Sequence, residues 1–465
     1  MTNDSSDRPG GPLADPLADH PRPAPGAIGA LERGFFGHPR GLSTLFFTEM
    51  WERFSYYGMR AFLILYMVNA LNFDDKHAGS IYGTYTASAW AAAIFGGIIA
   101  DRWLGQYKSV LIGGIIITLG HFTLVFHPLP FFYAGLALIV IGTGLLKPNV
   151  SGIVGSLYDK TDARRDAGFS IFYMGINLGA ALGPFVAGYF AQRVDWHLGF
   201  ACAGIGMTLG LIQYVAGRKH LQPAIERLAA QRRAAPVAQA ASAPTSRGFT
   251  REEWKRLAAM AVFFVFAAIF WGAYEQAGST LNLFGDRFSR TSILGFNFPS
   301  SWFQTVQAIF VILLAPIFAW LWTRLGRHEP STPAKFAFGL FFTGLSFLFL
   351  LPAAGYIQNS TLPVRVSPFW LIGCYFLQEL GELCLSPVGL SVFTKLSPVK
   401  IVGMMLGVWF MADAVGSKVA GSAAGFMSTA PLTSIFGWVA GVCLGASVVA
   451  FLLIRPVRGL MGGIH

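Results

Sequence analysis

EMWERFSYYGMR, residues 49–60, places two carboxylates and two guanidinium groups inside a segment, 42–71, that is otherwise apolar enough to cross a bilayer. Ionisable groups in a membrane helix are costly and usually mark a transport or proton pathway. At helical spacing the polar residues of this stretch share one face that extends roughly 17 Å, most of the depth of the hydrocarbon core. These residues are Glu49, Glu52, Arg53, Tyr56, Tyr57 and Arg60. The face predicts a polar interior; the alternative is a buried ion-pair cluster that only holds helices together.

The composition of the whole chain is that of a membrane protein that crosses the bilayer several times. Of its 465 residues, 54% are hydrophobic and 12% are charged, about half the charged fraction of an ordinary soluble domain. Runs long enough to span a bilayer occur at 42–71, 79–100, 109–126, 131–154, 167–191, 196–216, 257–284, 300–323, 335–353, 367–393, 401–427 and 431–454. The sequence therefore predicts an all-α polytopic membrane protein with twelve transmembrane helices.

A polar stretch, residues 217–256, separates the first six apolar runs from the last six. It divides the chain into two predicted six-helix bundles, 42–216 and 257–454, with a cytoplasmic tail at each end, 1–41 and 455–465. The first of these tails is rich in Pro, Asp and Gly, which predicts disorder. It has no apolar core and no small-residue cleavage site, so we do not expect a removable signal peptide.

The net charge of +11 encodes orientation rather than a nucleic-acid partner. If both termini are cytoplasmic, the lysines and arginines of the inner segments outnumber those of the outer loops by about five to one. This asymmetry predicts that both tails and the linker 217–256 face the cytoplasm.

A weak internal repeat in the sequence supports the division of the chain into two similar halves. GGIIADRWLGQYK (96–108) follows the second apolar run and APIFAWLWTRLGR (315–327) ends the eighth, and both place a Gly-containing, cation-bearing turn at the same point of each half. The first copy resembles the loop motif of the major facilitator superfamily, in which an Asp and basic residues tie helix ends together. The resemblance implies two bundles around a central cavity that opens alternately to either side of the membrane.

Each half also contains intramembrane charges of both signs. The predicted helices include the cations Arg53, Arg60, Lys147 and Lys418 and the anions Glu49, Glu52, Glu275, Glu379, Glu382 and Asp413. Ion pairs across the halves would form only when one side of the cavity closes, which would make them switches; pairs within one half would be structural. Asp413 and Lys418 lie five residues apart on one predicted helix and fit the structural reading. His121, the one histidine well inside an apolar run, fits a packed residue better than a functional one.

Five motifs carry a more specific resemblance. The stretch 49–58, EMWERFSYYG, matches the ExxERFxYYG signature of the proton-dependent oligopeptide transporter family in every specified position. The other segments that resemble this family are GLLKPNVSGIVG (144–155), FYMGINLGA (172–180), FWGAYEQ (270–276) and GELCLSPVG (381–389). Because they come from both halves, the resemblance covers essentially the whole transmembrane region.

The resemblance implies a site that holds a peptide by its two termini. Arg53 and Lys147 would bind its carboxylate, and Glu382 and Asn177 its amine. The complete set of expected peptide-binding residues, including tryptophans that could instead face lipid, is Arg53, Tyr56, Tyr57, Trp90, Lys147, Asn177, Trp271, Gln307, Glu382, Ser386 and Trp409. Proton coupling would involve Glu49, Glu52, Arg53 and Glu382, and Arg60 with Glu275 would form an ion pair that closes the extracellular side.

Three positions depart from the family pattern. Gly83 occupies the column of a second-helix histidine found in animal members, which favours a bacterial-type mechanism driven by carboxylates. Trp90 replaces a common tyrosine, and Gln307 replaces an asparagine that assists at the peptide amine. The linker 217–256 is too polar to contain the two extra helices of many bacterial members.

Together these features predict a proton-coupled symporter that imports di- and tripeptides across the bacterial inner membrane, functional as a monomer, with the proton as coupling ion and no cofactor or metal. The nearest alternative is a transporter of another small anion such as nitrate, or of another metabolite; a drug exporter or a peptide sensor fits less well. No nucleophile, metal or cofactor motif favours an enzyme.

Overall fold

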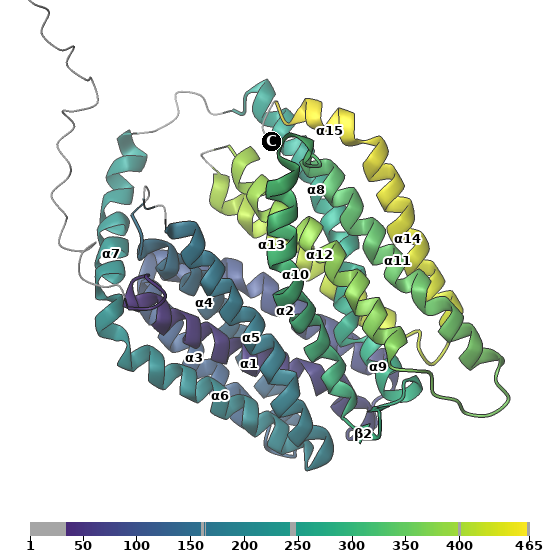
Figure 1. Ribbon diagram of the computed structural model, residues 1–465. Helices are drawn as coiled ribbons and strands as arrows, with labels where there is room; N and C mark the ends of the chain where they lie inside the picture. The colour runs from purple at the N-terminus through teal and green to yellow at the C-terminus, as the bar shows by residue number, and fades with distance from the viewer. Residues whose placement is uncertain (1–33, 160–161, 163, 242–247, 399–400, 463–465) are drawn as a thin grey trace, which may run out of the picture.

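The computed structural model describes residues 34–159, 162, 164–241, 248–398 and 401–462. Most of the predicted N-terminal tail, residues 1–33, lies outside these ranges. Each of the twelve predicted spanning segments corresponds to a long helix or a helix pair (Figure 1), so the predicted all-α class is confirmed. Seven helices of the described ranges meet the length and hydropathy expected of a membrane span, and α1 (Arg40–Asn69), with its ionisable residues, is not among them.

The helices form two bundles. The N-terminal bundle contains α1 and then α2 (Asp75–Ile99), α3 (Gln106–Thr123), α4 (Leu129–Ser156), α5 (Arg165–Arg193) and α6 (Trp196–Ala216). The C-terminal bundle contains α8 (Arg251–Tyr274), which continues through a 3-10 turn (Glu275–Gly278) into α9 (Thr280–Phe288), and then α10 (Phe303–Leu325), α11 (Thr332–Asn359), α12 (Phe369–Leu396), α13 (Val402–Ala424), α14 (Leu432–Leu452) and the short α15 (Ile454–Leu460). A small hairpin, β1 (Ser292–Ile293) and β2 (Phe296–Asn297), precedes α10.

Local sequence explains several helix boundaries. The Asp74 side chain accepts a hydrogen bond from the His77 backbone N–H at 2.8 Å and caps α2. Thr250 and Glu253 form a reciprocal capping box that starts α8. After α2 the chain turns at Gly105, whose φ of 76° favours glycine. This glycine belongs to the loop motif 96–108, and its positive φ explains why the motif contains a glycine at this turn.

The two bundles touch most closely where α2 packs against α13 and α5 against α10. Glycines allow the first contact: a Cβ on Gly83 would lie 3.0 Å from the Gly421 Cα and 3.1 Å from the Lys418 carbonyl oxygen. The position therefore has no room for a histidine side chain, which gives the departure noted at Gly83 a packing explanation.

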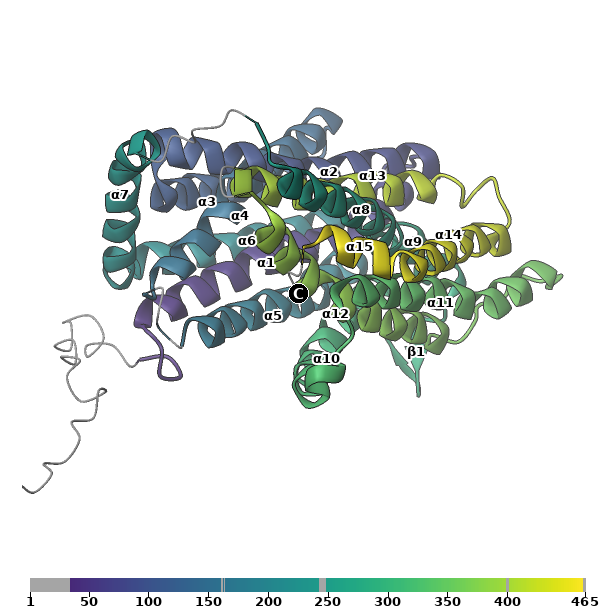
Figure 2. The same ribbon diagram turned by 90° about the horizontal axis from the view of Figure 1, so that it is seen from above.

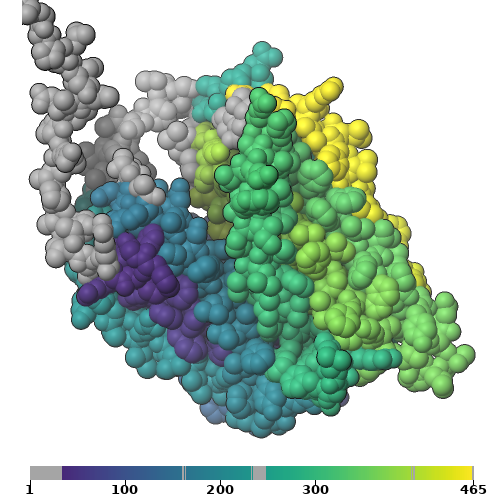
Figure 3. All heavy atoms as spheres, viewed as in Figure 1, coloured from purple at the N-terminus to yellow at the C-terminus, as the bar shows by residue number. Residues whose placement is uncertain are grey.

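The bundles meet at one end and separate toward the other. We call the meeting end, formed by residues 69–75, 192–195 and 275–303, the closed end; there Asn282 Nδ2 of α9 donates to the Ala61 carbonyl of α1 at 2.8 Å. The opposite end, at the end of α4 and the start of α5, is the open end, and Figure 3 shows a gap between the two bundles there.

The polar linker contains a helix that the sequence analysis did not predict, α7 (Arg218–Ala241). It lies across the open end of the N-terminal bundle in both ribbon views (Figures 1 and 2). Leu221 and Ala224 are fully buried against that bundle, whereas Arg218 and Lys219 are exposed. The first turns of the helix are therefore amphipathic, with one side packed on the bundle.

Candidate functional site

The polar face of α1 is buried inside the protein. Glu49 and Arg53 are each 3% exposed. The Arg53 Nε lies 2.9 Å from Glu49 Oε1 and 2.5 Å from Glu52 Oε2, so one guanidinium group is shared by two carboxylates. Gly179 of α5 permits this, since a Cβ there would lie 2.9 Å from the Arg53 Cβ. These three groups together carry one surplus negative charge, which a proton on a carboxylate or the nearby Lys147 can balance.

Part of this cluster has unused hydrogen-bonding capacity. Glu49 Oε2 and Arg53 Nη2 are buried and have no hydrogen-bond partner in the described part of the chain. Unpaired groups of this kind are costly unless a ligand, a proton or water satisfies them. The arrangement can therefore exchange a proton at a carboxylate and bind a carboxylate at the guanidinium group.

Lys147 approaches the same region from α4. Its Nζ lies over the Trp90 ring, 2.7 Å from the centroid. Phe410 of α13 stacks on the same tryptophan, with 5.9 Å between the ring centroids. Arg53 is close enough to act electrostatically on the Lys147 ammonium group. Two cations held together repel each other, which favours an anionic partner between them.

Glu382 belongs to α12, in the C-terminal bundle. It is 7% exposed, and its Oε2 has no hydrogen-bond partner among the described residues. Ser386, one helical turn further on, interacts with its carboxylate. One turn before it, Glu379 accepts a hydrogen bond from the Tyr274 hydroxyl of α8 at 2.8 Å. Tyr274 was missed as a site residue, although it lies inside the FWGAYEQ motif.

The two amides named as amine contacts are engaged within the protein. Asn177 Nδ2 donates to the Tyr173 carbonyl of its own helix at 3.0 Å. Gln307 Nε2 of α10 donates to Gln378 Oε1 of α12 at 3.1 Å. Each amide oxygen has further acceptor capacity, and an amine could use it.

The tryptophans divide into two environments. Trp271 and Trp409 are 9% and 6% exposed and belong to the core of the C-terminal bundle. Trp409 packs against Phe336 and Phe393, so the alternative that these residues face lipid is wrong. Trp90 is half-buried and contacts the Lys147 ammonium group instead.

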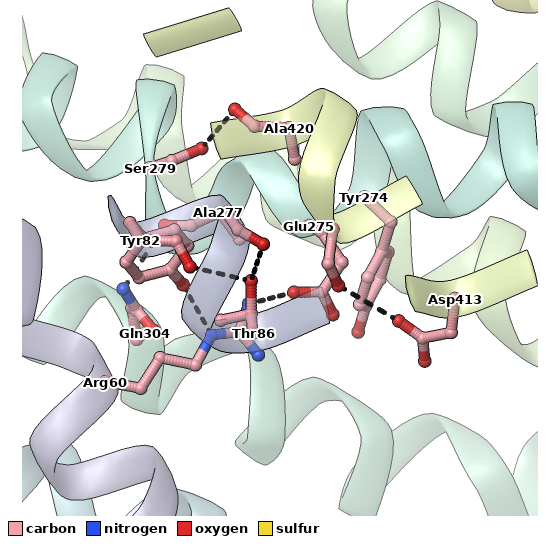
Figure 4. Close-up of polar contacts among 12 residues, drawn as sticks. Arg60, Tyr82, Thr86, Tyr274, Glu275, Ala277, Ser279, Gln304, Asp413 and Ala420 are labelled. Atoms are coloured by element: carbon pink, nitrogen blue, oxygen red, sulfur yellow. Dashed lines mark hydrogen bonds and ion pairs between the residues drawn. The ribbon is translucent and has the colours of Figure 1, made fainter. Parts of the chain in front are cut away.

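An ion pair joins the two bundles at the closed end (Figure 4). Arg60 of α1 donates through Nη2 to Glu275, at the junction of α8 and its 3-10 turn. Its Nε donates to the Tyr82 hydroxyl of α2 at 2.6 Å, and its guanidinium group lies 5.7 Å from the centroid of Tyr57. Tyr82 was missed, because an aromatic residue in an apolar run gives no signal of a polar partner.

A second polar layer lies beside this pair. Arg287 of α9 binds Asp75 of α2 with two hydrogen bonds, at 2.8 and 2.6 Å. Asp286 accepts from Asn69 at 3.3 Å and from Ser300 at 2.6 Å. The two pairs that join the bundles were also missed, since their members are 212 and 217 residues apart in sequence. The closed end is therefore held by several bonds between bundles.

Several other intramembrane charges form no ion pair within the described residues. No ion pair joins Lys147 to Glu382 within the described residues. Lys418 donates to Thr84 Oγ1 of α2 at 2.7 Å, whereas Asp413 accepts from Ser417 at 3.3 Å and lies near Glu275 in Figure 4. Asp413 and Lys418 are thus not each other's partners. His121 is fully buried, and neither ring nitrogen has a hydrogen-bond partner in the described ranges.

Comparison with known proteins places these features in a family. The model of the POT family matches residues 107–227 and 224–439. The chain is 40% identical to the uncharacterized transporter YclF of Bacillus subtilis (strain 168), covering 93% of this chain and 97% of that protein. It is 35% identical to a di-/tripeptide transporter of Lactococcus lactis subsp. cremoris, covering 94% and 99%.

Solved structures of peptide and POT family transporters are similar to this chain over most of its length. A crystal structure of a mutant of the peptide transporter POT with alafosfalin superposes with a TM-score of 0.83 at 39% identity, covering 93% of this chain and 98% of that one. A POT family transporter in complex with a thioalcohol conjugated peptide gives a TM-score of 0.81 at 31% identity, covering 91% and 98%. The chain belongs to the POT family and has the twelve-helix fold of the major facilitator superfamily.

Proposed function

We propose that this protein is a proton-coupled symporter that imports di- and tripeptides by alternating access across the bacterial inner membrane. Several relatives bear the name of peptide or di-/tripeptide transporters. The single observation that supports this substrate best is the distribution of charge: Arg53 and Lys147 line one bundle, and Glu382 lines the other. A zwitterionic peptide matches this dipole, whereas nitrate would leave Glu382 without a partner.

The orientation follows from charge. The open end contains the basic helix α7, and the positive-inside rule assigns such a segment to the cytoplasm. The open end then faces the cytoplasm, and the closed end, with Arg60 and Glu275, faces outward. Since each chain contains both halves of the site, a monomer suffices for transport.

In the proposed cycle, protons from outside load Glu49 or Glu52, and Glu382 takes part in coupling. Neutralising either α1 carboxylate weakens its bond to Arg53, and the guanidinium group then becomes free for the peptide carboxylate. The peptide amine meets Glu382, so the substrate bridges the bundles and the outer end closes. Release of the proton to the cytoplasm restores the Arg53 pairs and expels the peptide.

Energetically, one proton supports roughly tenfold accumulation of peptide per pH unit, because a pH unit corresponds to about 1.4 kcal/mol. The membrane potential adds about 2.3 kcal/mol per 100 mV for each net charge moved. Protons alone can therefore drive uptake without a cofactor.

The decisive experiment uses purified protein in liposomes. Glu49→Gln is expected to lose dialanine uptake driven by a pH gradient while it retains exchange of labelled for unlabelled dialanine. Glu226→Gln, at an exposed position of α7, serves as the control and should retain both activities. If driven uptake survives in Glu49→Gln, the coupling assignment is wrong.

A competition assay tests the substrate class. Unlabelled dipeptides and tripeptides are expected to block uptake of labelled dialanine by the wild-type protein, and nitrate is not. Competition by nitrate but not by peptides would overturn the proposed substrate.

A further inference from the structure

A cavity separate from the central site lies at the open end. It has a volume of about 410 Å³ and lies between the end of α4, the start of α5 and the linker helix α7. Its lining includes Ser151, Gly152, Arg165, Phe169, Arg227 and Leu228. A space of this size has room for a phosphate group and several waters.

Two arginines from different helices line this cavity. Arg165 comes from the first turn of α5, and its guanidinium group lies 5.8 Å from the Phe169 ring centroid. Arg227 comes from α7, where its Nη1 donates to the Ser156 carbonyl at 3.3 Å and its Nη2 lies 3.2 Å from Asp159 Oδ1. Arg227 is thus already fixed in place before any ligand arrives.

Arg165 makes fewer polar contacts than Arg227 within the described ranges. Its Nε is buried and has no hydrogen-bond partner within the described ranges. The Asp159 side chain is 75% exposed and is paired with Arg227, so the two arginines still leave the cavity with one positive charge. Arg165 lines the cavity and makes no ion pair within the described ranges, so its guanidinium group can bind an anion there.

The position of the cavity points to the class of anion. α4 ends at Ser156 and α5 begins at Arg165, and the ends of spanning helices lie at the level of lipid headgroups. The lining combines arginines with the apolar Phe169 and Leu228, which suits a headgroup with adjoining hydrocarbon. Arginine favours phosphate because its planar fork can donate two parallel hydrogen bonds.

We propose that this cavity binds a phosphate-bearing anion, namely the headgroup of an anionic phospholipid in the leaflet at the open end. The ligand would join the α4–α5 corner to α7 through Arg165 and Arg227. This site is independent of the peptide site, and the inference does not rest on the proposed function.

Native mass spectrometry of the full-length protein in detergent tests the proposal. Phosphatidylglycerol is expected to bind more tightly than phosphatidylcholine. The double variant Arg165→Gln with Arg227→Gln is expected to bind phosphatidylglycerol roughly tenfold more weakly or worse, because it loses two charged donors. Arg233→Gln removes a charge of the same sign from an exposed position of α7 and should bind like the wild-type protein.

A second variant, Gly152→Leu, tests the role of the cavity without removing a charge. A Cβ on Gly152 has no atom within 4 Å, so Gly152→Leu can fold normally and fill the cavity instead. It is expected to lose the tight phosphatidylglycerol site as well. If both the double variant and Gly152→Leu bind phosphatidylglycerol like Arg233→Gln, the proposal is overturned.

A competition experiment with soluble phosphate compounds distinguishes a lipid headgroup from a soluble phosphate ester as the ligand. Inorganic phosphate and glycerol phosphate are added as competitors to lipid-loaded protein. No displacement at millimolar concentration supports the lipid headgroup as the ligand. Displacement that depends on Arg165 and Arg227 would support phosphate recognition but overturn the lipid assignment in favour of a soluble phosphate ester.

Discussion

Arg60 shows how one residue joins three helices at the closed end. Its guanidinium group binds Glu275 across the bundle interface, and its Nε donates to Tyr82 at 2.6 Å. Tyr82 is fully buried. The tyrosine therefore fixes the orientation of the guanidinium fork, and the cross-bundle bond depends on this support.

Removing the Tyr82 hydroxyl tests this dependence. Tyr82→Phe leaves the buried Arg60 Nε without an acceptor, which costs about 1–3 kcal/mol. The melting temperature of the purified protein, followed by intrinsic fluorescence, is expected to fall. Tyr133→Phe removes a hydroxyl from an exposed tyrosine and should leave the melting temperature unchanged. Equal shifts in both variants would contradict a specific role of Tyr82.

At the scale of elements, the contact between α2 and α13 depends on the absence of side chains. Gly79 and Gly83 face Gly421 so closely that an added Cβ would meet backbone atoms. Backbone cannot move aside as a flexible side chain can, so the two helices would have to separate. This contact continues along the interface to the stacked rings of Trp90 and Phe410.

Gly83→His introduces the residue that the family resemblance leads us to expect at this position. We expect it to destabilise the protein by about 1–3 kcal/mol through overpacking, visible as a lower melting temperature and a smaller monodisperse fraction in size-exclusion chromatography. Gly97→Ala is the control, because a Cβ there has no atom within 4 Å. A Gly83→His protein as stable as the wild type would show that α2 and α13 can separate without cost.

At the scale of the whole molecule, transport requires the closed end to open and the open end to close. The bonds across the closed end, including the bidentate pair of Asp75 with Arg287, set the balance between these states. Interfaces of this kind switch between discrete arrangements rather than deforming continuously. Weakening one bond should therefore shift the populations of two states.

A double-mutant cycle measures this effect. Asp75→Asn and Arg287→Gln are each expected to increase the population open at the closed end, and their combination should show a coupling of about 0.5–3 kcal/mol. The populations are read from spin-label distances between positions His77 and Leu294, both exposed. The surface pair Glu252 with Lys255 provides a control cycle, which is expected to show no coupling in the same distances because an ion pair in water contributes little. Absence of coupling at Asp75 and Arg287 would show that their ion pair does not hold the closed end together.

Much of this molecule follows from local patterns along the chain. Apolar runs of spanning length identify the twelve helices, because each helix satisfies its own backbone hydrogen bonds in lipid. The α1 stripe from Glu49 to Arg60 indicates a polar interior for the same energetic reason: charges there cannot face hydrocarbon. The family motifs add names for the residues of the site, and their roles in binding and coupling remain predictions.

Other features depend on which segments meet in space, and no local pattern encodes that. Tyr82 became a partner of Arg60, and Asp75 of Arg287, because the packing of two bundles brings residues far apart in sequence within hydrogen-bonding distance. The sequence did not predict the helix α7, because its segment is polar overall. Its few apolar residues, such as Leu221 and Ala224, become buried only when they pack against the folded N-terminal bundle. Lys147 and Glu382 form no ion pair within the described residues, which fits a conformation in which the bundles touch at one end and part at the other.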